Sequence, residues 1–72
     1  MVTPAQLRAI RAMLNVSQQE FADTIDLARS TYVSYEKGLK ISQKSLDKII
    51  NYATSQNLTF YEGGVIMNKV NQ

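Results

Sequence analysis

Residues 17–38, SQQEFADTIDLARSTYVSYEKG, constrain the fold more than any other part of this chain. Ser17 and Glu20 form a capping box, in which each side chain satisfies the other's backbone donor at the start of a helix. The apolar residues that follow keep helical spacing, and the pattern breaks at residues 26–28. A second short helix is predicted from about residue 29 to residue 37. Two helices joined by a tight polar corner are therefore predicted here.

Two further helices are predicted on either side of this unit. Thr3 and Pro4 begin the first, with Gln6 reaching back to the cap, and Asn15 can close it in a left-handed conformation. Ser42 caps the last, which Asn57 can end, and Gly38 is a suitable stop for the helix before it. The predicted buried residues recur with helical spacing: Leu7, Ile10 and Leu14; Phe21, Ala22 and Ile25; Tyr32 and Tyr35; Leu46, Ile49, Ile50 and Ala53.

The last part of the chain changes character. Residues 58–70, LTFYEGGVIMNKV, place β-forming residues on both sides of Gly63-Gly64, which permits the positive φ angles of a two-residue turn. An isolated hairpin is marginal in water, so this one should pack on the helices or pair with a second copy. A frayed tail is the alternative. We expect a mainly α fold, with a helical domain over residues 1–57 and a β-rich tail, a short hairpin or strand, over residues 58–72.

Composition limits the chemistry that this chain can perform. Its 72 residues form one domain without cysteine or histidine, which removes disulfides, thiolate metal sites and the commonest general base. Glu20, Asp23 and Asp26 lie on a short exposed helix without a metal-ligand or acid/base partner. No phosphate loop or nucleophile–base pair is present. We therefore expect no enzyme, no cofactor and no metal site.

Charge is distributed unevenly, although the net charge is only +2. Residues 20–26 are acidic, whereas residues 29–48 are basic. Such asymmetry can steer a polyanion to one face, and ordinary solvated helix surfaces are the alternative. The basic residues are Arg29, Lys37, Lys40, Lys44 and Lys48.

The segment LRAIRAMLNVSQQEFADTIDLARSTYVSYEKG, with SLDKII after it, resembles the lambda-repressor-like (Cro/CI, or XRE) helix-turn-helix family from about Leu7 to Ala53. Ala22 stands where the family has a small residue at a close helix crossing. Arg11 and Glu36 match two residues that form a largely buried ion pair in the family. The resemblance implies four to five helices, with the helix at about residues 29–37 in the DNA major groove.

The resemblance also implies which side chains contact DNA. Arginine can bind guanine through two parallel hydrogen bonds, whereas serine and threonine make shorter and less discriminating contacts. The implied base contacts are Gln18, Arg29, Ser30, Thr31 and Ser34. The implied phosphate contacts are Ser17, Gln18, Lys37, Lys40 and Lys44.

The sequence departs from the family pattern in two places. The family usually has glycine at the corner position of Asp26, where the backbone turns left-handed, so we expect an intact corner at a cost of about 1 kcal/mol. Arg29 is the only long polar side chain among the expected readers on the recognition helix. Val33 lies beside it, and Tyr32 could be partly exposed. This surface fits modest sequence specificity, or contact with a protein.

Two functions follow from the resemblance. The first is a cytoplasmic, nucleoid-associated regulator of prokaryotic or phage origin that binds double-stranded DNA and acts as a repressor. It would bind as a homodimer to half-sites about 34 Å apart, paired through the tail (Phe60, Val65, Ile66) or the fourth helix. The alternative is a protein-binding modulator, an antirepressor that binds a repressor or an antitoxin that binds a toxin. Neither requires a membrane or a small-molecule ligand.

Overall fold

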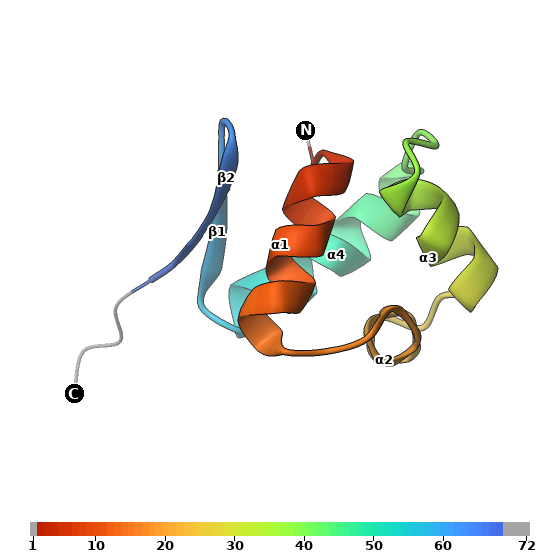
Figure 1. The fold of residues 1–72 in the computed structure, drawn as a ribbon, viewed down its shortest axis with the longest axis horizontal. Coiled ribbons are helices and arrows are strands. Elements are labelled where there is room, and N and C mark those ends of the chain that lie inside the picture. The colour runs from red at the N-terminus through yellow and green to blue at the C-terminus, as the bar shows by residue number, and fades with distance from the viewer. Residues whose placement is uncertain (1, 69–72) are drawn as a thin grey trace.

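The structure, a computed structural model, describes residues 2–68, which form four helices and one two-stranded antiparallel sheet (Figure 1). The prediction of a mainly α fold with a C-terminal hairpin is confirmed. Residues 69–72 of the predicted tail lie outside the described residues. The elements are α1 (Pro4–Leu14), α2 (Gln18–Thr24), α3 (Arg29–Glu36), α4 (Gln43–Ser55), β1 (Leu58–Tyr61) and β2 (Gly64–Met67).

The predicted helix starts are confirmed, and the helix ends lie within two residues of their predicted positions. Ser17 Oγ accepts the Glu20 N–H at 3.0 Å, and a Glu20 carboxylate oxygen accepts the Ser17 N–H at 2.8 Å. Asn15 closes α1 with φ 56°, in the left-handed region. Helix α3 ends at Glu36, one residue before its predicted end, and Gly38 follows with φ 108°. Glycine is suited to this position because it lacks the Cβ that strains a left-handed backbone.

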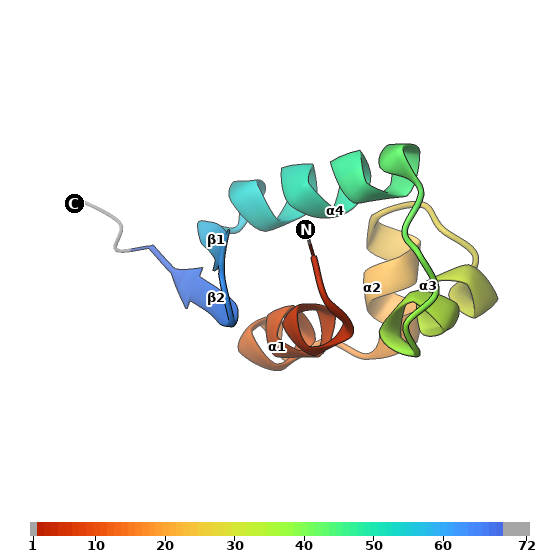
Figure 2. The same ribbon diagram turned by 90° about the horizontal axis from the view of Figure 1, so that it is seen from above.

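The core lies between α1 and α4, which flank the interior, and the α2–α3 pair that closes one end (Figure 2). Tyr32 is fully buried, and its ring stacks on Phe21 with centroids 4.9 Å apart. The prediction that Tyr32 faces inward is therefore confirmed, and the alternative of partial exposure is wrong. Ile50, predicted on the apolar face of α4, is 38% exposed, because successive residues of a helix point about 100° apart and Ile49 occupies the core side.

The hairpin turns one residue earlier than predicted. Tyr61 pairs with Gly64, so the turn residues are Glu62 and Gly63, and only Gly63 has a positive φ, 92°. This is the pattern of a type II turn rather than of a turn with two positive φ angles. Gly64 instead makes room for the Tyr61 side chain, since a Cβ there would lie 2.8 Å from the Tyr61 hydroxyl.

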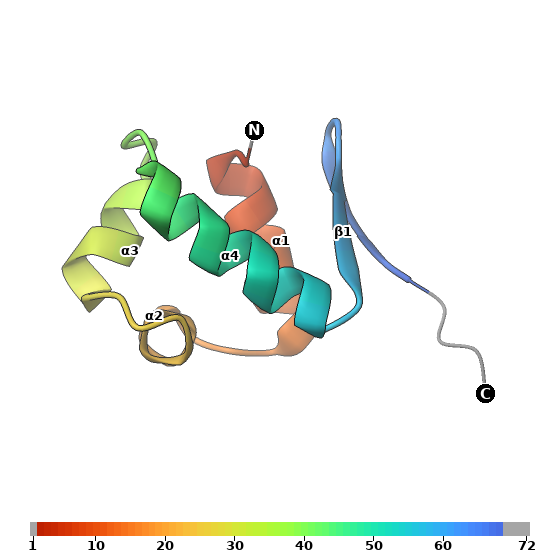
Figure 3. The same cartoon turned by 180° about the vertical axis from the view of Figure 1, so that it is seen from behind.

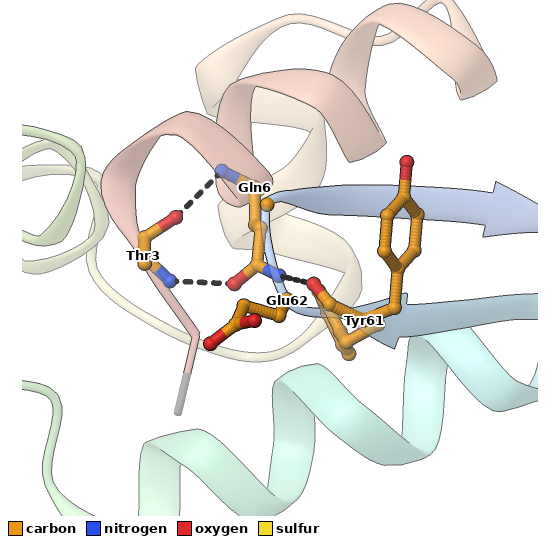
Figure 4. A pocket seen from close by; sticks show the side chains of 6 residues that line it. Thr3, Gln6, Tyr61 and Glu62 are labelled. Atoms are coloured by element: carbon orange, nitrogen blue, oxygen red, sulfur yellow. Dashed lines mark hydrogen bonds between the residues drawn. The ribbon is translucent and has the colours of Figure 1, made fainter.

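The hairpin packs on the helices of its own chain. Leu58 and Val65 are buried in the core, and Figure 3 shows α4 running across the molecule to β1. The Gln6 side-chain amide donates to the Tyr61 carbonyl at 2.7 Å and to the Gly64 carbonyl at 2.9 Å (Figure 4 shows the first of these bonds). For residues 58–68 the alternative of a frayed tail is therefore wrong.

Candidate nucleic-acid interface

Helix α3 has a polar outer side and a buried inner side. Arg29 and Ser30 are exposed, whereas Thr31 and Ser34 are partly exposed. The inner side carries Tyr32, Tyr35 and Glu36, all buried. At 1.5 Å per residue, an eight-residue helix is about 12 Å long, which suits a short reading surface. The four predicted base contacts on α3 are thus all open to solvent to some degree.

Ser34 has a preferred hydrogen-bonding role. Its hydroxyl donates to the Ser30 carbonyl at 2.9 Å, one turn earlier in α3. A hydroxyl has one hydrogen and two lone pairs, so a Ser34 that keeps this bond offers only acceptor positions to an outside partner.

Four side chains from three helices meet at Glu36; we call Arg11, Gln18, Tyr32 and Glu36 the Glu36 cluster. Arg11 donates to both carboxylate oxygens, from Nε at 2.6 Å and from the terminal guanidinium nitrogen Nη2 at 3.0 Å. The Tyr32 hydroxyl and the Gln18 amide, at 3.2 Å, also donate to this carboxylate. The Arg11–Glu36 pair is the one that the family resemblance implies. Because four donors surround one carboxylate, the cluster fixes α3 against α1 and α2.

The cluster also keeps its members in defined protonation states. Burial acts to raise the pKa of Glu36, but hydrogen bonds from Arg11, Tyr32 and Gln18 outweigh it and hold that pKa below its usual value. Burial, helped by the bond to Glu36, raises the pKa of Tyr32 well above its usual value. Glu36 is therefore charged and Tyr32 neutral at neutral pH, which is the arrangement that the hydrogen bonds require.

Two predicted DNA contacts at the start of α2 already take part in internal bonds. The half-buried Gln18 amide donates one N–H to Glu36, which leaves its carbonyl and second N–H for any other partner. Ser17 Oγ accepts the Glu20 N–H, a bond in which the hydroxyl hydrogen takes no part. Their contact with DNA stays a prediction.

The predicted phosphate contacts on lysine lie beyond the C-terminal end of α3. Lys37, Lys40 and Lys44 are exposed, on the cap of α3, the following loop and the first turn of α4. That loop lies beside the end of α3 (Figure 1). Since Arg29 begins α3, positive charge flanks the serine and threonine residues at both ends of the helix.

Lys48, the remaining basic residue of this segment, supports the corner between α2 and α3. Asp26 has φ 58°, the left-handed conformation expected from the family pattern. Lys48 Nζ donates to the Asp26 backbone carbonyl at 3.1 Å. This bond joins α4 to the corner across a separation of 22 residues.

Sequence reasoning missed several of these bonds. Tyr32 and Glu36 are four residues apart on one helix, a spacing that places side chains on the same face and could have indicated the bond. No local signal pairs Gln18 with Glu36. Arg8 was also missed; one of its terminal guanidinium nitrogens donates to the Glu36 backbone carbonyl at 3.1 Å, at the end of α3.

Residues 2–68 contain neither a metal-binding cluster nor a membrane-spanning helix. No group of three or more histidine, cysteine, aspartate or glutamate residues is placed to hold a metal ion. None of the helices in this range combines the length and apolar character needed to cross a bilayer.

Comparison with known proteins gives one match. The family model described as helix-turn-helix (HTH_3) matches residues 7–53, which include all of α2 and α3. No curated protein and no solved structure matches the chain.

Proposed function

Because the chain belongs to the lambda-repressor-like (XRE) branch of the helix-turn-helix family, we propose that it is a sequence-specific DNA-binding regulator that acts as a repressor. The observation that carries the proposal is the construction of α3. Its outer side is polar and open, and its inner side is held by the four hydrogen bonds to Glu36. A rigid helix with a polar outer side is what reading base edges in the major groove requires.

Arg29 is the principal base reader in this proposal. It begins α3 and is exposed, and an arginine at such a position can bind guanine O6 and N7 together. Ser34, whose hydrogen is engaged with Ser30, would accept a hydrogen bond from the amino group of adenine or cytosine. Ser30, Thr31 and the outward part of Gln18 complete the reading surface.

Phosphate contacts would come from the two sides of this surface. Lys37, Lys40 and Lys44 supply positive charge beyond the end of α3, and the Ser17 hydroxyl supplies a neutral donor at the start of α2. Each neutralised phosphate releases counterions, so affinity should fall steeply as salt concentration rises.

Repression would follow from occupation of an operator that overlaps a promoter, without chemistry by the protein. Two copies would bind half-sites about one helical turn apart, roughly 34 Å. Of the tail residues predicted to join them, Val65 is buried and Phe60 partly buried in the protein's own core. Ile66, half exposed on β2, is the one that a partner copy could reach without rearrangement.

Fluorescence anisotropy tests the proposal. The protein is titrated against DNA flanking its gene and against random duplex, across a salt series. We expect tight binding to one site and a large margin over random DNA. Arg29→Ala should weaken specific binding by about 1–3 kcal/mol and relax preference at one base pair. The matched variant Lys44→Ala should weaken binding to both DNAs alike and reduce the salt slope by about one unit.

Equal, weak binding to both DNAs would contradict the proposal. It would favour the alternative of a protein-binding modulator, an antirepressor or antitoxin, on the same fold. An Arg29→Ala variant that bound specific and random DNA as the parent does would remove Arg29 from the reading surface.

A further inference from the structure

An open groove of about 690 Å³ lies between the first turn of α1, the end of α3 and the start of α4. We call it the α3–α4 groove. This volume is within the range of sites that bind ligands in proteins. Leu39 on its edge is 58% exposed, which is more than any other large hydrophobic residue that the structure describes. The apolar residues that line the groove are Val2, Pro4, Tyr35, Leu39, Ile41 and Leu46.

Charge at the groove is of one sign. Lys40 is its one charged lining residue, and Lys37 and Lys44 lie close by in sequence; all three are exposed. The buried Glu36 carboxylate is surrounded by its own donors. Asp47, one turn along α4, accepts a hydrogen bond from Gln43 at 2.9 Å. An occupant of the groove therefore meets Lys40 beside an apolar floor, with Lys37 and Lys44 a few residues away on either side in sequence.

Neither DNA nor a second copy of this chain matches both the apolar floor of the groove and its positive charge. DNA phosphates would pair with the lysines but would leave Leu39 and the apolar floor without a partner. A second copy related by a two-fold axis would bring the same lysines together, and like charges at an interface are unfavourable. The matching occupant carries carboxylates and apolar side chains in one short segment.

We propose that the α3–α4 groove binds an acidic peptide segment of a partner protein. Its apolar side chains lie against Leu39, Ile41 and Leu46, and its carboxylates lie on Lys37, Lys40 and Lys44. Because these lysines are also the proposed phosphate contacts, the peptide and DNA exclude one another. This part rests on the proposed function and makes the groove the place where a partner releases the regulator from its operator.

The first test is a titration of isotope-labelled protein with a synthetic peptide of about twelve residues, glutamates and aspartates around two leucines and a phenylalanine, followed by amide chemical shifts. We expect saturable shifts at residues 38–46 and at Val2. Two matched peptides serve as controls, one with lysine for every acid and one with serine for every apolar residue. Each should bind at least about tenfold more weakly, a difference of about 1.4 kcal/mol.

Variants at exposed residues test whether the peptide binds at the groove or elsewhere on the molecule. Leu39→Ser should weaken peptide binding about tenfold or more, and because Leu39 is exposed the fold is not expected to change. Ile66→Ser removes a similarly exposed apolar side chain on the hairpin and should leave peptide binding unchanged. Lys40→Gln should weaken binding of both the peptide and DNA.

A competition experiment tests the exclusion. The acidic peptide should displace labelled DNA from the parent protein, and Leu39→Ser should keep its DNA at the same peptide concentration. The DNA titration without peptide tests the proposed function alone. The chemical shifts test peptide binding at the groove, and their result does not depend on whether the protein binds DNA. A ternary complex of protein, peptide and DNA would overturn the exclusion.

Other outcomes overturn the groove site itself. These are the absence of saturable shifts, equal binding of the lysine peptide, or shifts confined to the outer side of α3, where the peptide would only imitate DNA. A protein dimer in sedimentation that is lost in Leu39→Ser would assign the groove to a second copy instead.

Discussion

Two buried polar side chains, Gln6 and Glu36, hold opposite ends of this molecule together by different means. Gln6 is 5% exposed and joins α1 to the hairpin; Glu36 is 7% exposed and joins α3 to α1 and α2. One is neutral and the other is charged. The end that contains α3 is held by interactions that are costly to break, whereas the hairpin end is held by interactions that can open locally.

Both the oxygen and the nitrogen of the Gln6 side-chain amide form hydrogen bonds. Its oxygen accepts the Thr3 N–H at 2.8 Å, and its nitrogen donates to the Tyr61 carbonyl (Figure 4) and also to the Gly64 carbonyl. Neutral hydrogen bonds contribute about 1 kcal/mol each, net of the bonds to water that they replace. The hairpin therefore depends on a few neutral bonds and on the burial of Leu58 and Val65.

The Glu36 carboxylate differs from the Gln6 amide in the free-energy cost of burying it. Removing a charge from water is costly, and the surrounding donors compensate for that cost. Loss of Arg11 leaves this buried charge without its counter-ion, so the penalty exceeds that of a lost neutral bond.

Arg11→Ala should have the largest effect, a loss of about 3–5 kcal/mol in the free energy of unfolding, because it leaves Glu36 charged and unpaired. Urea unfolding followed by circular dichroism measures it. Since much of a small domain's stability is at stake, the double variant Arg11→Met/Glu36→Leu provides a second measurement. It should recover part of the loss, because apolar replacement of both charges is often neutral, whereas the buried Tyr32 hydroxyl loses its acceptor. A loss below about 1 kcal/mol in Arg11→Ala would remove the distinction between the two ends.

Gln6→Ala should cost about 2 kcal/mol, since it leaves two backbone carbonyls without their donor. The loss should be local. We expect faster amide hydrogen exchange in β1 and β2 and unchanged exchange in α2 and α3. Gln19→Ala is the matched control, because Gln19 is exposed and bonds only to Asp23. Faster exchange throughout the chain would show that the hairpin and the helices unfold as one unit.

Tyr32→Phe should cost about 1.5 kcal/mol, because it removes one hydrogen bond to a charged acceptor while the ring keeps its place on Phe21. Tyr35→Phe is the matched control, since the Tyr35 hydroxyl bonds to the neutral Ser45 hydroxyl at 3.0 Å. Thermal unfolding of both variants compares two α3 tyrosines, one bonded to a charged acceptor and the other to a neutral acceptor on α4. Equal losses would show that the charge of Glu36 adds nothing to its hydrogen bonds.

The pH dependence of the unfolding free energy should also distinguish the two ends of the molecule, and this is the smallest of the expected effects. The pKa of Glu36 is lower in the folded than in the unfolded protein, so its contribution to stability is present above its usual pKa of 4.5. It is lost as the pH falls through the folded value. Glu36→Gln should therefore flatten the decline of the unfolding free energy below pH 4.5, whereas Gln6→Ala should keep it, because an amide does not titrate.

Glu20 provides the control for this measurement. Its hydrogen bonds with Ser17 also lower its pKa, so Glu20→Gln should flatten the acid decline as well, but without affecting the Glu36 cluster. A Glu36→Gln variant with the full decline of the parent would mean that Glu36 has the same pKa in the folded and unfolded protein.

The elements of this fold could be predicted because their signals are local. Capping residues such as Ser17 and Glu20 set helix starts, and Asn15 and Gly38 set helix ends, all within a few residues of the bonds they make. The turn lies one residue earlier than its local signal predicts, because two adjacent glycines permit a positive φ at either position and the strand register selects Gly63.

The internal supports of the candidate site could not be predicted in the same way. The bond from Gln18 to Glu36 spans 18 residues, and the bond from Lys48 to Asp26 spans 22. No periodicity in the sequence connects such pairs. Their partners are set by where helices cross, which depends on the packing of Phe21, Ala22 and Tyr32 in three dimensions.

The hydrogen bonds from Gln6 to the hairpin also bear on the order in which the protein folds. The two carbonyl partners of Gln6 lie 55 and 58 residues further along the chain and are therefore synthesised well after it. Bringing such distant residues together carries a larger entropic cost than forming the local turns of α2 and α3. We expect a growing chain to form its helices first, and the first turn of α1 to gain its last hydrogen bonds only when the hairpin emerges and docks.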